Sequence, residues 1–238
     1  MLGRRITILV GHFGSGKSEI AINLACAMAE TTGKVALVDL DVVKPYFRSR
    51  AARAELARCG IELIAPEGEN YYADLPILLP QVRAACMDRT RHVVIDAGGN
   101  DTGVRALGSL RDVIVPEDTS VFLVVNFRRP LTPDAAAAVA MARDIERTAR
   151  LDISGVISNT HLLDETTADV IREGLTLAAA TAEMLGVAVV DVAAEKRVSG
   201  EIKPNALGCP VIELQRSIRP VFDCPPKVLT RGPLFVMG

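Results

Sequence analysis

Eight consecutive residues near the start of the chain have the composition and spacing of a phosphate-binding loop. They satisfy the pattern G-x-x-x-x-G-K-S/T and are Gly11, His12, Phe13, Gly14, Ser15, Gly16, Lys17 and Ser18. Glycines let such a loop curl so that successive backbone N–H groups converge on an anion, and the following helix adds the positive end of its dipole. We expect Lys17 to reach the β- and γ-phosphates of a nucleoside triphosphate and the Ser18 hydroxyl to ligate Mg²⁺.

Aspartates close two apolar runs of the kind that form buried strands. Asp39 and Asp41 end a Val- and Leu-rich run, and Asp96 ends a second run. Alternate side chains of a strand point the same way, so Asp39 and Asp41 can both face a phosphate at the carboxyl edge of a sheet. Asp96 begins a D-x-x-G arrangement in which Gly99 can donate its N–H to a γ-phosphate. Acids at strand ends also cap helices, but three in this order indicate a phosphate site.

The elements that must position these residues alternate along the chain. The apolar runs are mostly continuous and rich in Val and Ile, which is typical of strands covered on both faces. The predicted strands are Ile6–Val10, Val35–Asp39, Ile61–Ala65, His92–Asp96, Val121–Phe127, Ile153–Ser158 and Val187–Val192. Helical patterns between them include Lys17–Glu30, Pro133–Arg150 and Thr166–Leu185. This alternation predicts an α/β three-layer P-loop NTPase fold, with a mostly parallel sheet of about seven or eight strands and helices on both faces.

The length and organisation of the chain predict one domain over residues 1–238. The sequence has neither an internal repeat nor a long Pro/Gly/Ser linker. Prolines become frequent from Pro204 onward, so we expect residues 203–238 to form an irregular C-terminal extension with one short strand, Val211–Leu214.

Composition excludes several classes of function. A net charge of -2 gives no electrostatic footprint for nucleic acid. A cluster at Arg48, Arg50, Arg53 and Arg58 is read as a solvated helix face. The chain has no apolar run near the ~20 residues that span a bilayer, and its first residues lack the features of a signal peptide. We therefore expect a soluble cytoplasmic protein without stable membrane insertion.

The cysteines are five in number and widely spaced, which argues against a disulfide framework and a self-contained zinc site. Cys26 falls in a helical apolar pattern and is interpreted as a packing residue. Cys209 and Cys224 each precede a proline in predicted loops, where a structural thiol is the simplest interpretation.

A few other residues invite chemistry. Arg128 and Arg129 follow a predicted strand, where they could contact phosphate or a partner. The charge pattern favours the alternative that both are solvated loop charges. His161 lies beside Asn159, either near a base or in a plain turn, and His92 opens a strand in a structural role.

Together, the P-loop, the strand-ending D-x-D and the D-x-x-G resemble the MinD/ParA group of ATPases (the CobQ/CobB/MinD/ParA or SIMIBI class). The resemblance covers roughly residues 5–192 and is strongest in the first hundred. That group includes the nitrogenase iron protein, CobQ/CobB-type domains and the nickel-inserting accessory ATPase of carbon monoxide dehydrogenase. The segment from Asp39 to Arg50 is also similar to an uncharacterised ATP-binding branch of the group.

The resemblance implies a role for each matching residue. Asp41 corresponds to the switch I aspartate that positions the attacking water, Asp39 to the acid near Mg²⁺, and Asp96 to the Walker B acid. Catalysis is thus expected to involve Lys17, Asp41 and Asp39, and metal binding to involve Ser18, Asp39 and Asp96. The expected nucleotide contacts are Gly11, His12, Phe13, Gly14, Ser15, Gly16, Lys17, Ser18, Glu19, Gly99 and Asn159.

Base choice and dimerisation depend on two further positions. Asn159 stands where the family uses an asparagine to hold adenine, or it is a plain strand-end turn residue. GTP-specific relatives have an acid three positions later, where this chain has Leu162, so ATP is favoured. Many members carry a second lysine after the first P-loop glycine, which reaches across a dimer; this chain has His12, which either donates to phosphate when protonated or caps the loop.

Three functions remain open at this point. The leading hypothesis is a slowly hydrolysing ATPase switch that binds ATP/ADP and Mg²⁺. It would act on an unidentified protein partner, for example in metalloenzyme maturation. It would also form a nucleotide-dependent homodimer if His12 permits. The second is an ATP-dependent small-molecule enzyme, either a kinase or a CobQ/CobB-type amidotransferase or synthetase-like domain. The third is a non-catalytic, ATP-bound metallocentre chaperone in which Cys209 or Cys224 binds metal.

Overall fold

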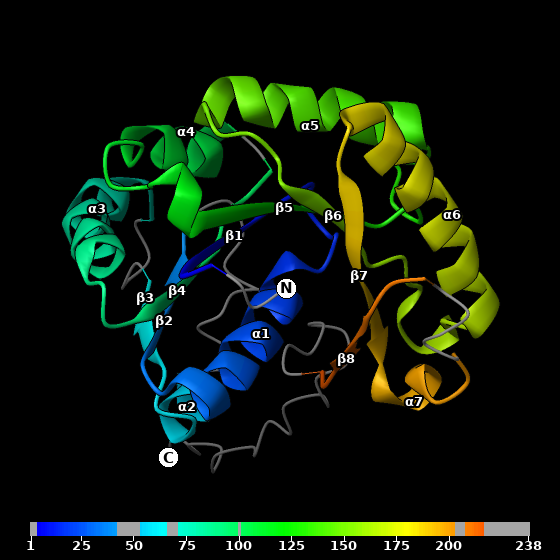
Figure 1. The fold of residues 1–238 in the computed structure, drawn as a ribbon, viewed down its shortest axis with the longest axis horizontal. Helices are drawn as coiled ribbons and strands as arrows, with labels where there is room; N and C mark the ends of the chain where they lie inside the picture. Colours follow the sequence, from blue (N-terminus) through cyan, green and yellow to red (C-terminus); the bar gives the residue numbers. More distant parts are fainter. Residues whose placement is uncertain (1–3, 42–52, 66–70, 100, 203–207, 217–238) are drawn as a thin grey trace, which may run out of the picture.

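A single eight-stranded sheet runs through the molecule (Figure 1). The strands lie in the order β3-β2-β4-β1-β5-β6-β7-β8, and every pairing is parallel. Their bounds are β1 Ile6–Val10, β2 Val35–Asp39, β3 Glu62–Ile64, β4 His92–Asp96, β5 Thr119–Val125, β6 Gly155–Ser158, β7 Ala188–Glu195 and β8 Val211–Leu214. The computed structural model describes residues 4–41, 53–65, 71–99, 101–202 and 208–216.

Helices cover both faces of the sheet and complete three layers (Figure 1). Side chains of α3, α4, α5 and α6 form one core cluster with the sheet, and those of α1 and α2 form a second cluster on the opposite face. The bounds are α1 Lys17–Thr32, α2 Arg53–Arg58, α3 Tyr71–Met87, α4 Asp101–Ser109, α5 Ala135–Ala149, α6 Ala168–Leu185 and α7 Lys196–Ser199. The predicted α/β three-layer fold is confirmed.

The alternation of side chains along a strand explains the two cores. In β1, Ile6, Ile8 and Val10 point to the cluster under α3–α6, whereas Leu9 points to the cluster under α1. All five residues of β1 are buried. Because both faces are covered, the strands appear in the sequence as continuous apolar runs.

Most predicted elements are present, with shifted ends. The predicted strand Val121–Phe127 is Thr119–Val125, and the predicted strand Val187–Val192 extends to Glu195. The predicted helix Pro133–Arg150 starts later, at Ala135, because the Asp134 side chain accepts a hydrogen bond from Ala137 N and caps the helix. The side chain of Thr167 caps α6 in the same way, by accepting from Val170 N.

Part of the C-terminal prediction lies within the described residues. The short strand Val211–Leu214 is confirmed as β8 at the edge of the sheet. Residues 203–207 and 217–238, Cys224 among them, lie outside the described stretches, as do Arg48 and Arg50 of the basic cluster.

The strand order sets the place of the functional site. From β1 the chain builds outward to β2 and β3, returns to β4 beside β1, and then continues with β5 on the other side. The carboxyl end of β1 is therefore a switch point of the sheet, where open α/β sheets bind their ligands. The loop from Gly11 to Ser18 begins at this end.

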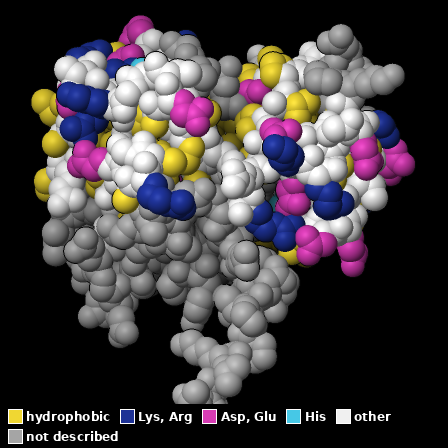
Figure 2. Space-filling view, turned by 90° about the horizontal axis from the view of Figure 1, so that it is seen from below, with side chains coloured by type: hydrophobic (Ala, Val, Ile, Leu, Met, Phe, Trp, Pro, Cys, Tyr) yellow, Lys and Arg dark blue, Asp and Glu magenta, His cyan; other side chains and the backbone are white. Residues whose placement is uncertain are grey.

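The distribution of charged side chains on the surface agrees with the near-neutral net charge of the chain (Figure 2). On the face in Figure 2, positive and negative side chains of the described residues are interspersed. Surface ion pairs among the described residues include Arg83–Asp112 and Arg128–Glu173. Among the described helices, none combines the length and apolar composition that a membrane span requires.

Candidate nucleotide-binding site

The loop between β1 and α1 depends on its glycines. Gly11, Gly14 and Gly16 have φ of 144°, 78° and 87°, in the region that side chains strongly disfavour. A Cβ on Gly11 would lie 2.3 Å from the carbonyl oxygen of Val124 in β5, and a Cβ on Gly16 would lie 2.1 Å from Nδ2 of Asn159. The loop thus packs directly against the neighbouring strand ends.

Hydrogen bonds hold the loop in its curled shape by engaging its carbonyl groups. Lys17 Nζ donates to His12 O at 2.9 Å. Arg129 Nε donates to Gly14 O at 2.9 Å. Asn159 Nδ2 donates to Ser15 O at 2.7 Å. With its oxygens turned to these donors, the loop can present N–H groups to an anion.

The charge of the loop is concentrated in Lys17. The residue is only 4% exposed. Burial lowers its pKa, and the nearby carboxylates of Asp96 and Asp41 oppose that effect. An ammonium group this poorly hydrated is stabilised by adding negative charge beside it, as a phosphate would do.

His12 behaves as a neutral part of the loop. Its backbone oxygen accepts from Lys17, and its Nδ1 accepts from Phe13 N at 3.2 Å. Burial, followed by the charge of Lys17, lowers the pKa of the imidazole. These contacts favour the loop-capping interpretation over donation from a protonated imidazole.

Two aspartates meet at the ends of adjacent strands. Asp39 of β2 and Asp96 of β4 are paired in register, although they lie far apart in the chain. Both are buried, at 1% and 0% exposure. Oδ1 of Asp39 accepts from Asp41 N at 3.1 Å, so the D-x-D segment folds back on its first acid. Asp41 itself lines the cavity beside the loop.

Asp96 carries the clearest electrostatic signature of the site. Neither of its carboxylate oxygens has a hydrogen-bond partner among the described residues. Burial raises its pKa to about 6, opposed by Lys17 and then by the Ser18 hydroxyl, which is near without meeting hydrogen-bond geometry. A buried carboxylate lacking partners is costly unless a cation or a donor completes it.

This arrangement suits a magnesium ion. Mg²⁺ takes oxygen ligands and typically keeps several waters, so one hydroxyl and nearby carboxylates suffice. Ser18, Asp39 and Asp96 supply that set at one sheet edge. In the described part of the chain, no group of three or more His, Cys, Asp and Glu side chains is gathered for a metal. Water and phosphate oxygens would complete the coordination of an ion held by Ser18, Asp39 and Asp96.

The turn after β4 presses against the loop. Ala97 N donates to Leu9 O at 3.0 Å, which continues the β4–β1 pairing past Asp96. Two residues later, a Cβ on Gly99 would lie 2.1 Å from Gly11 O. The predicted D-x-x-G glycine therefore lies in contact with the first residue of the phosphate loop.

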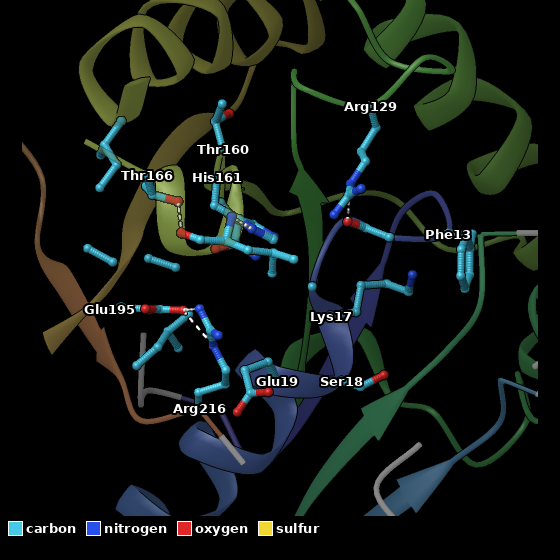
Figure 3. A pocket seen from close by; sticks show the side chains of 18 of the residues that line it. Phe13, Lys17, Ser18, Glu19, Arg129, Thr160, His161, Thr166, Glu195 and Arg216 are labelled. Atoms are coloured by element: carbon cyan, nitrogen blue, oxygen red, sulfur yellow. Dashed lines mark hydrogen bonds and ion pairs between the residues drawn. The ribbon is translucent and has the colours of Figure 1, made fainter. Parts of the chain in front are cut away.

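A cavity of about 270 Å³ extends from the loop toward the ends of β6, β7 and β8. Figure 3 shows Phe13, Lys17 and Arg129 at one end and Thr166, Glu195 and Arg216 at the other. Apolar side chains also line the cavity, among them Leu163, Ile171, Ala193 and Leu214. A polar anion end joined to a largely apolar compartment fits a nucleotide, with its phosphates on the loop and its base beyond.

The residues beside Asn159 also belong to this cavity. Asn159 is 3% exposed and lines it, together with His161. Burial, followed by the charges of Arg129 and Arg216, lowers the pKa of His161 to about 4. Its Nδ1 accepts from Leu163 N at 3.3 Å, so the neutral ring is a fixed part of the wall. His161 is thus more than a plain turn residue.

Sequence reasoning misjudged or missed three cavity residues. The prediction that Arg129 is a solvated charge is wrong, whereas its neighbour Arg128 does pair with Glu173 at the surface. Glu195 and Arg216 were not foreseen; Arg216 Nε donates to Glu195 Oε1 at 2.9 Å. Glu195 ends β7 and Arg216 follows β8, so the carboxyl-edge rule applied to the aspartates could have found both.

The remaining candidates lie elsewhere. Cys209 is half-buried, and burial, followed by the charge of Asp191, raises the pKa of its thiol. His92 opens β4, as predicted, with a buried Nδ1 that has no hydrogen-bond partner in the described structure.

These features define the class of the protein. A parallel sheet with a strand–glycine loop–helix unit at its switch point, a buried lysine in the loop and acids at the adjoining strand ends is a P-loop nucleotide-binding domain. More specifically, the chain belongs to the CbiA family, the CobQ/CobB/MinD/ParA nucleotide binding domain, whose family model matches residues 6–199.

Solved structures share the fold. FtsY from Mycoplasma mycoides matches with a TM-score of 0.54 and 22% identity, over 79% of this chain and 60% of that one. Cell division protein FtsY from Thermotoga maritima matches with a TM-score of 0.51 and 21% identity, over 80% of this chain and 62% of that one. The signal recognition particle 54 kDa protein from Aeropyrum pernix K1, solved in complex with GDP, matches with a TM-score of 0.51 and 20% identity. This match covers 78% of this chain and 40% of that one.

These likenesses concern the fold of the domain. This chain spans less than two thirds of the length of each of the three proteins. A comparison with curated proteins finds no match to the sequence.

Proposed function

We propose that the chain is an ATP- and Mg²⁺-binding nucleotide switch that hydrolyses ATP slowly and acts on a protein partner. The observation that carries the proposal is the buried Asp96, whose oxygens lack hydrogen-bond partners in the described structure, beside Asp39 and near Lys17. A static structural role would leave these charges costly, whereas a phosphate–magnesium ligand neutralises both signs.

Magnesium would be held by Ser18 and, directly or through water, by Asp39 and Asp96. When bound, it would supply a positive charge that neutralises the phosphate oxygens. The Lys17 ammonium contributes a second positive charge from within the loop. The backbone N–H groups of Gly14, Gly16, Lys17 and Ser18 would orient the phosphates, whereas Ser15 N already donates to His12 O within the loop. Gly99 would add its N–H at the turn after β4.

Hydrolysis would be an in-line attack of water on the γ-phosphorus, in which the bond to the oxygen of the leaving ADP breaks. Asp41 lines the cavity near the phosphate loop, and we assign it the orientation of this water. Positioning and charge stabilisation would supply most of the rate. In many relatives, a second lysine carries a positive charge into the partner's site. The neutral His12 cannot replace that charge, because its pKa is lowered and its Nδ1 accepts from Phe13 N. We therefore do not expect turnover by a homodimer of the usual kind.

ATP is proposed over GTP because Leu162 stands where GTP-specific relatives have an acid. At the far end of the cavity, the Glu195 carboxylate is a hydrogen-bond acceptor, and it already accepts from Arg216 Nε. Asn159 remains the proposed adenine contact, although its Nδ2 already donates to Ser15 O. The resemblance to the nickel-inserting ATPase extends the proposal to partners in metalloenzyme maturation, in the cytoplasm.

A comparison of binding and turnover tests this function. Purified full-length chain is titrated with ATP and GTP with and without Mg²⁺, with thermal shift and phosphate release as readouts. We expect stabilisation by Mg–ATP exceeding that by Mg–GTP, and slow turnover that Asp41→Ala lowers by about 10²-fold. Asp152→Ala, an exposed acid before β6 at the opposite sheet edge, is the matched control.

Two outcomes would overturn the proposal. Rapid turnover by the isolated chain that is indifferent to Asp41→Ala would remove the switch mechanism. A failure of both nucleotides to stabilise the chain in the presence of Mg²⁺ would remove nucleotide binding itself.

A further inference from the structure

Two cysteine side chains meet on the face of the sheet that α1 and α2 cover. Cys26 lies in the C-terminal half of α1, and Cys59 follows the last residue of α2. Their Sγ atoms are 3.6 Å apart, although the residues are 33 positions apart in the chain. Figure 1 shows α2 beside that half of α1. Neither cysteine lines the nucleotide cavity.

A rigid turn presents Cys59. Gly60 has φ of 70°; its N–H donates to Ala57 O at 3.1 Å, and Ile61 N donates to Leu56 O at 3.0 Å. This pair of bonds across a left-handed glycine is the Schellman motif, in which Cys59 is the last residue before the glycine. The two hydrogen bonds of this turn therefore fix the position of the Cys59 backbone relative to α2.

The same core cluster anchors both thiols. Leu56 and Ile61, on either side of Cys59, are buried in the cluster under α1, and Cys26 packs against that cluster. The fold thus keeps the two side chains adjacent. The sulfur atoms need approach by only about 1.5 Å to reach the ~2.05 Å of a disulfide bond, and this approach can come from side-chain rotation.

Their exposure differs in a way that suits stepwise oxidation. Cys59 is exposed and Cys26 is partly buried behind it. Cys86, by contrast, is fully buried, and burial raises the pKa of its thiol to about 11, which makes it a poor nucleophile.

We propose that Cys26 and Cys59 form a reversible disulfide, joining α1 to the end of α2, when a peroxide-class oxidant acts on the protein. The Cys59 thiolate attacks the O–O bond of the peroxide and becomes a sulfenic acid, while the other oxygen leaves as water. The Cys26 thiolate then attacks the sulfenic sulfur, so that the S–S bond forms and the second oxygen leaves as water. Two thiols lose two electrons, and the peroxide is reduced to two waters; a dithiol reductant reverses the change.

The bond would close a loop that contains all of β2 together with Asp39 and Asp41. Oxidation would then restrict the unfolded chain around the acidic half of the nucleotide site, without placing a new group in the cavity. The expected result is an oxidised form that is more stable than the reduced form.

Peptide mapping of the full-length chain tests the bond directly. The protein is treated with one equivalent of hydrogen peroxide, its remaining thiols are blocked, and it is digested with trypsin under non-reducing conditions. Cleavage after Lys17, Lys34, Arg58 and Arg83 places the two cysteines in peptides 18–34 and 59–83. We expect these peptides to appear linked, about 2 Da lighter than their sum, and to separate on reduction.

Variants and thermal stability complete the test. Cys26→Ser and Cys59→Ser should abolish the linked species, whereas Cys209→Ser, a half-buried cysteine elsewhere, should keep it. Oxidised wild type should melt ~5 °C above reduced wild type, and oxidant should not raise the Tm of Cys59→Ser.

Three results would overturn the proposal. They are wild-type protein that remains fully reduced at these positions, Cys59 that goes to sulfinic acid without linking, and a dominant bond to Cys224 in place of the Cys26–Cys59 bond.

Discussion

A single methyl group on Gly99 should separate nucleotide binding from turnover. In Gly99→Ala, the new Cβ would lie 2.1 Å from the carbonyl oxygen of Gly11, 2.5 Å from its carbon and 2.9 Å from His12 N. Real Cβ contacts essentially never fall below 3.0 Å. All three neighbours are backbone atoms, so no side-chain rotation can relieve the clash.

The size of the effect follows from where the strain can go. The loop cannot retreat, because Gly11 already packs against Val124 O in β5. The turn after Asp96 must therefore move away by about 1 Å, and a misplacement of that size in a catalytic site costs on the order of 10²-fold in rate. We expect kcat/KM for ATP to fall by about that factor, since Gly99 is assigned to the γ-phosphate. ADP, which lacks this group, should bind within a few-fold of wild type.

The assay pairs steady-state phosphate release with binding of fluorescent ADP and a non-hydrolysable ATP analogue. Gly200→Ala is the matched control, because a Cβ there would meet nothing within 4 Å and its φ of -64° suits any residue. If Gly99→Ala and Gly200→Ala turned over ATP within twofold of each other, the close contact between the turn and the loop would have no functional weight and the reasoning would fail.

Two further predictions concern stability and base choice. Burial raises the pKa of Asp191 to about 6, from 3.8 in the unfolded chain, so folding loses stability as pH rises through that window. In urea titrations, Asp191→Asn should therefore raise the free energy of unfolding by ~1–2 kcal/mol at pH 7.5 and change it little at pH 4. An equal effect at both pH values would refute this. Leu162→Asp should shift the ATP/GTP affinity ratio toward GTP by ~10-fold or more, because the new carboxylate can accept from guanine N–H groups. Met184→Asp, at an exposed apolar site on α6, should leave that ratio unchanged in competition binding, and an unchanged ratio in Leu162→Asp would remove the base assignment.

The contiguous part of the site could be predicted from the sequence because its geometry is local. A strand, a glycine loop and a helix in succession define the phosphate cradle, and the position of Asp39 follows from the end of its own strand. The neighbourhood of Asp39 and Asp96 also follows, because parallel strands bring their carboxyl ends to one edge.

Contacts set by strand order could not be predicted in the same way. The bond from Arg129 to Gly14 exists because β5 lies beside β1, and that from Arg216 to Glu195 because β8 lies beside β7. Charge patterning along the chain carries no information on such neighbours. The proximity of Cys26 and Cys59 has the same cause, because these residues, 33 positions apart in the chain, meet only through the packing of α2 beside α1.

Helix α3 illustrates a different difficulty. It extends over Tyr71–Met87 and includes Pro76 and Pro80, and proline usually interrupts a helix. Local propensity argues against a helix there, yet Val82 and Cys86 are buried in the core cluster beneath it. The packing of an apolar face thus outweighs the low helix propensity of the two prolines.

The hydrogen bond from Asn159 Nδ2 to Ser15 O, only 2.7 Å long, joins the residue that follows β6 to the phosphate loop. A Cβ on Gly16 would lie 2.1 Å from the same Nδ2, so the loop and the Asn159 side chain are also in direct contact. The loop and Asn159 are therefore coupled in position, and a displacement of one must displace the other. Under the proposed function, in which Asn159 contacts adenine, the spacing between the base contact and the phosphate contacts is set before a ligand binds, and a ligand with a different spacing loses one of the two.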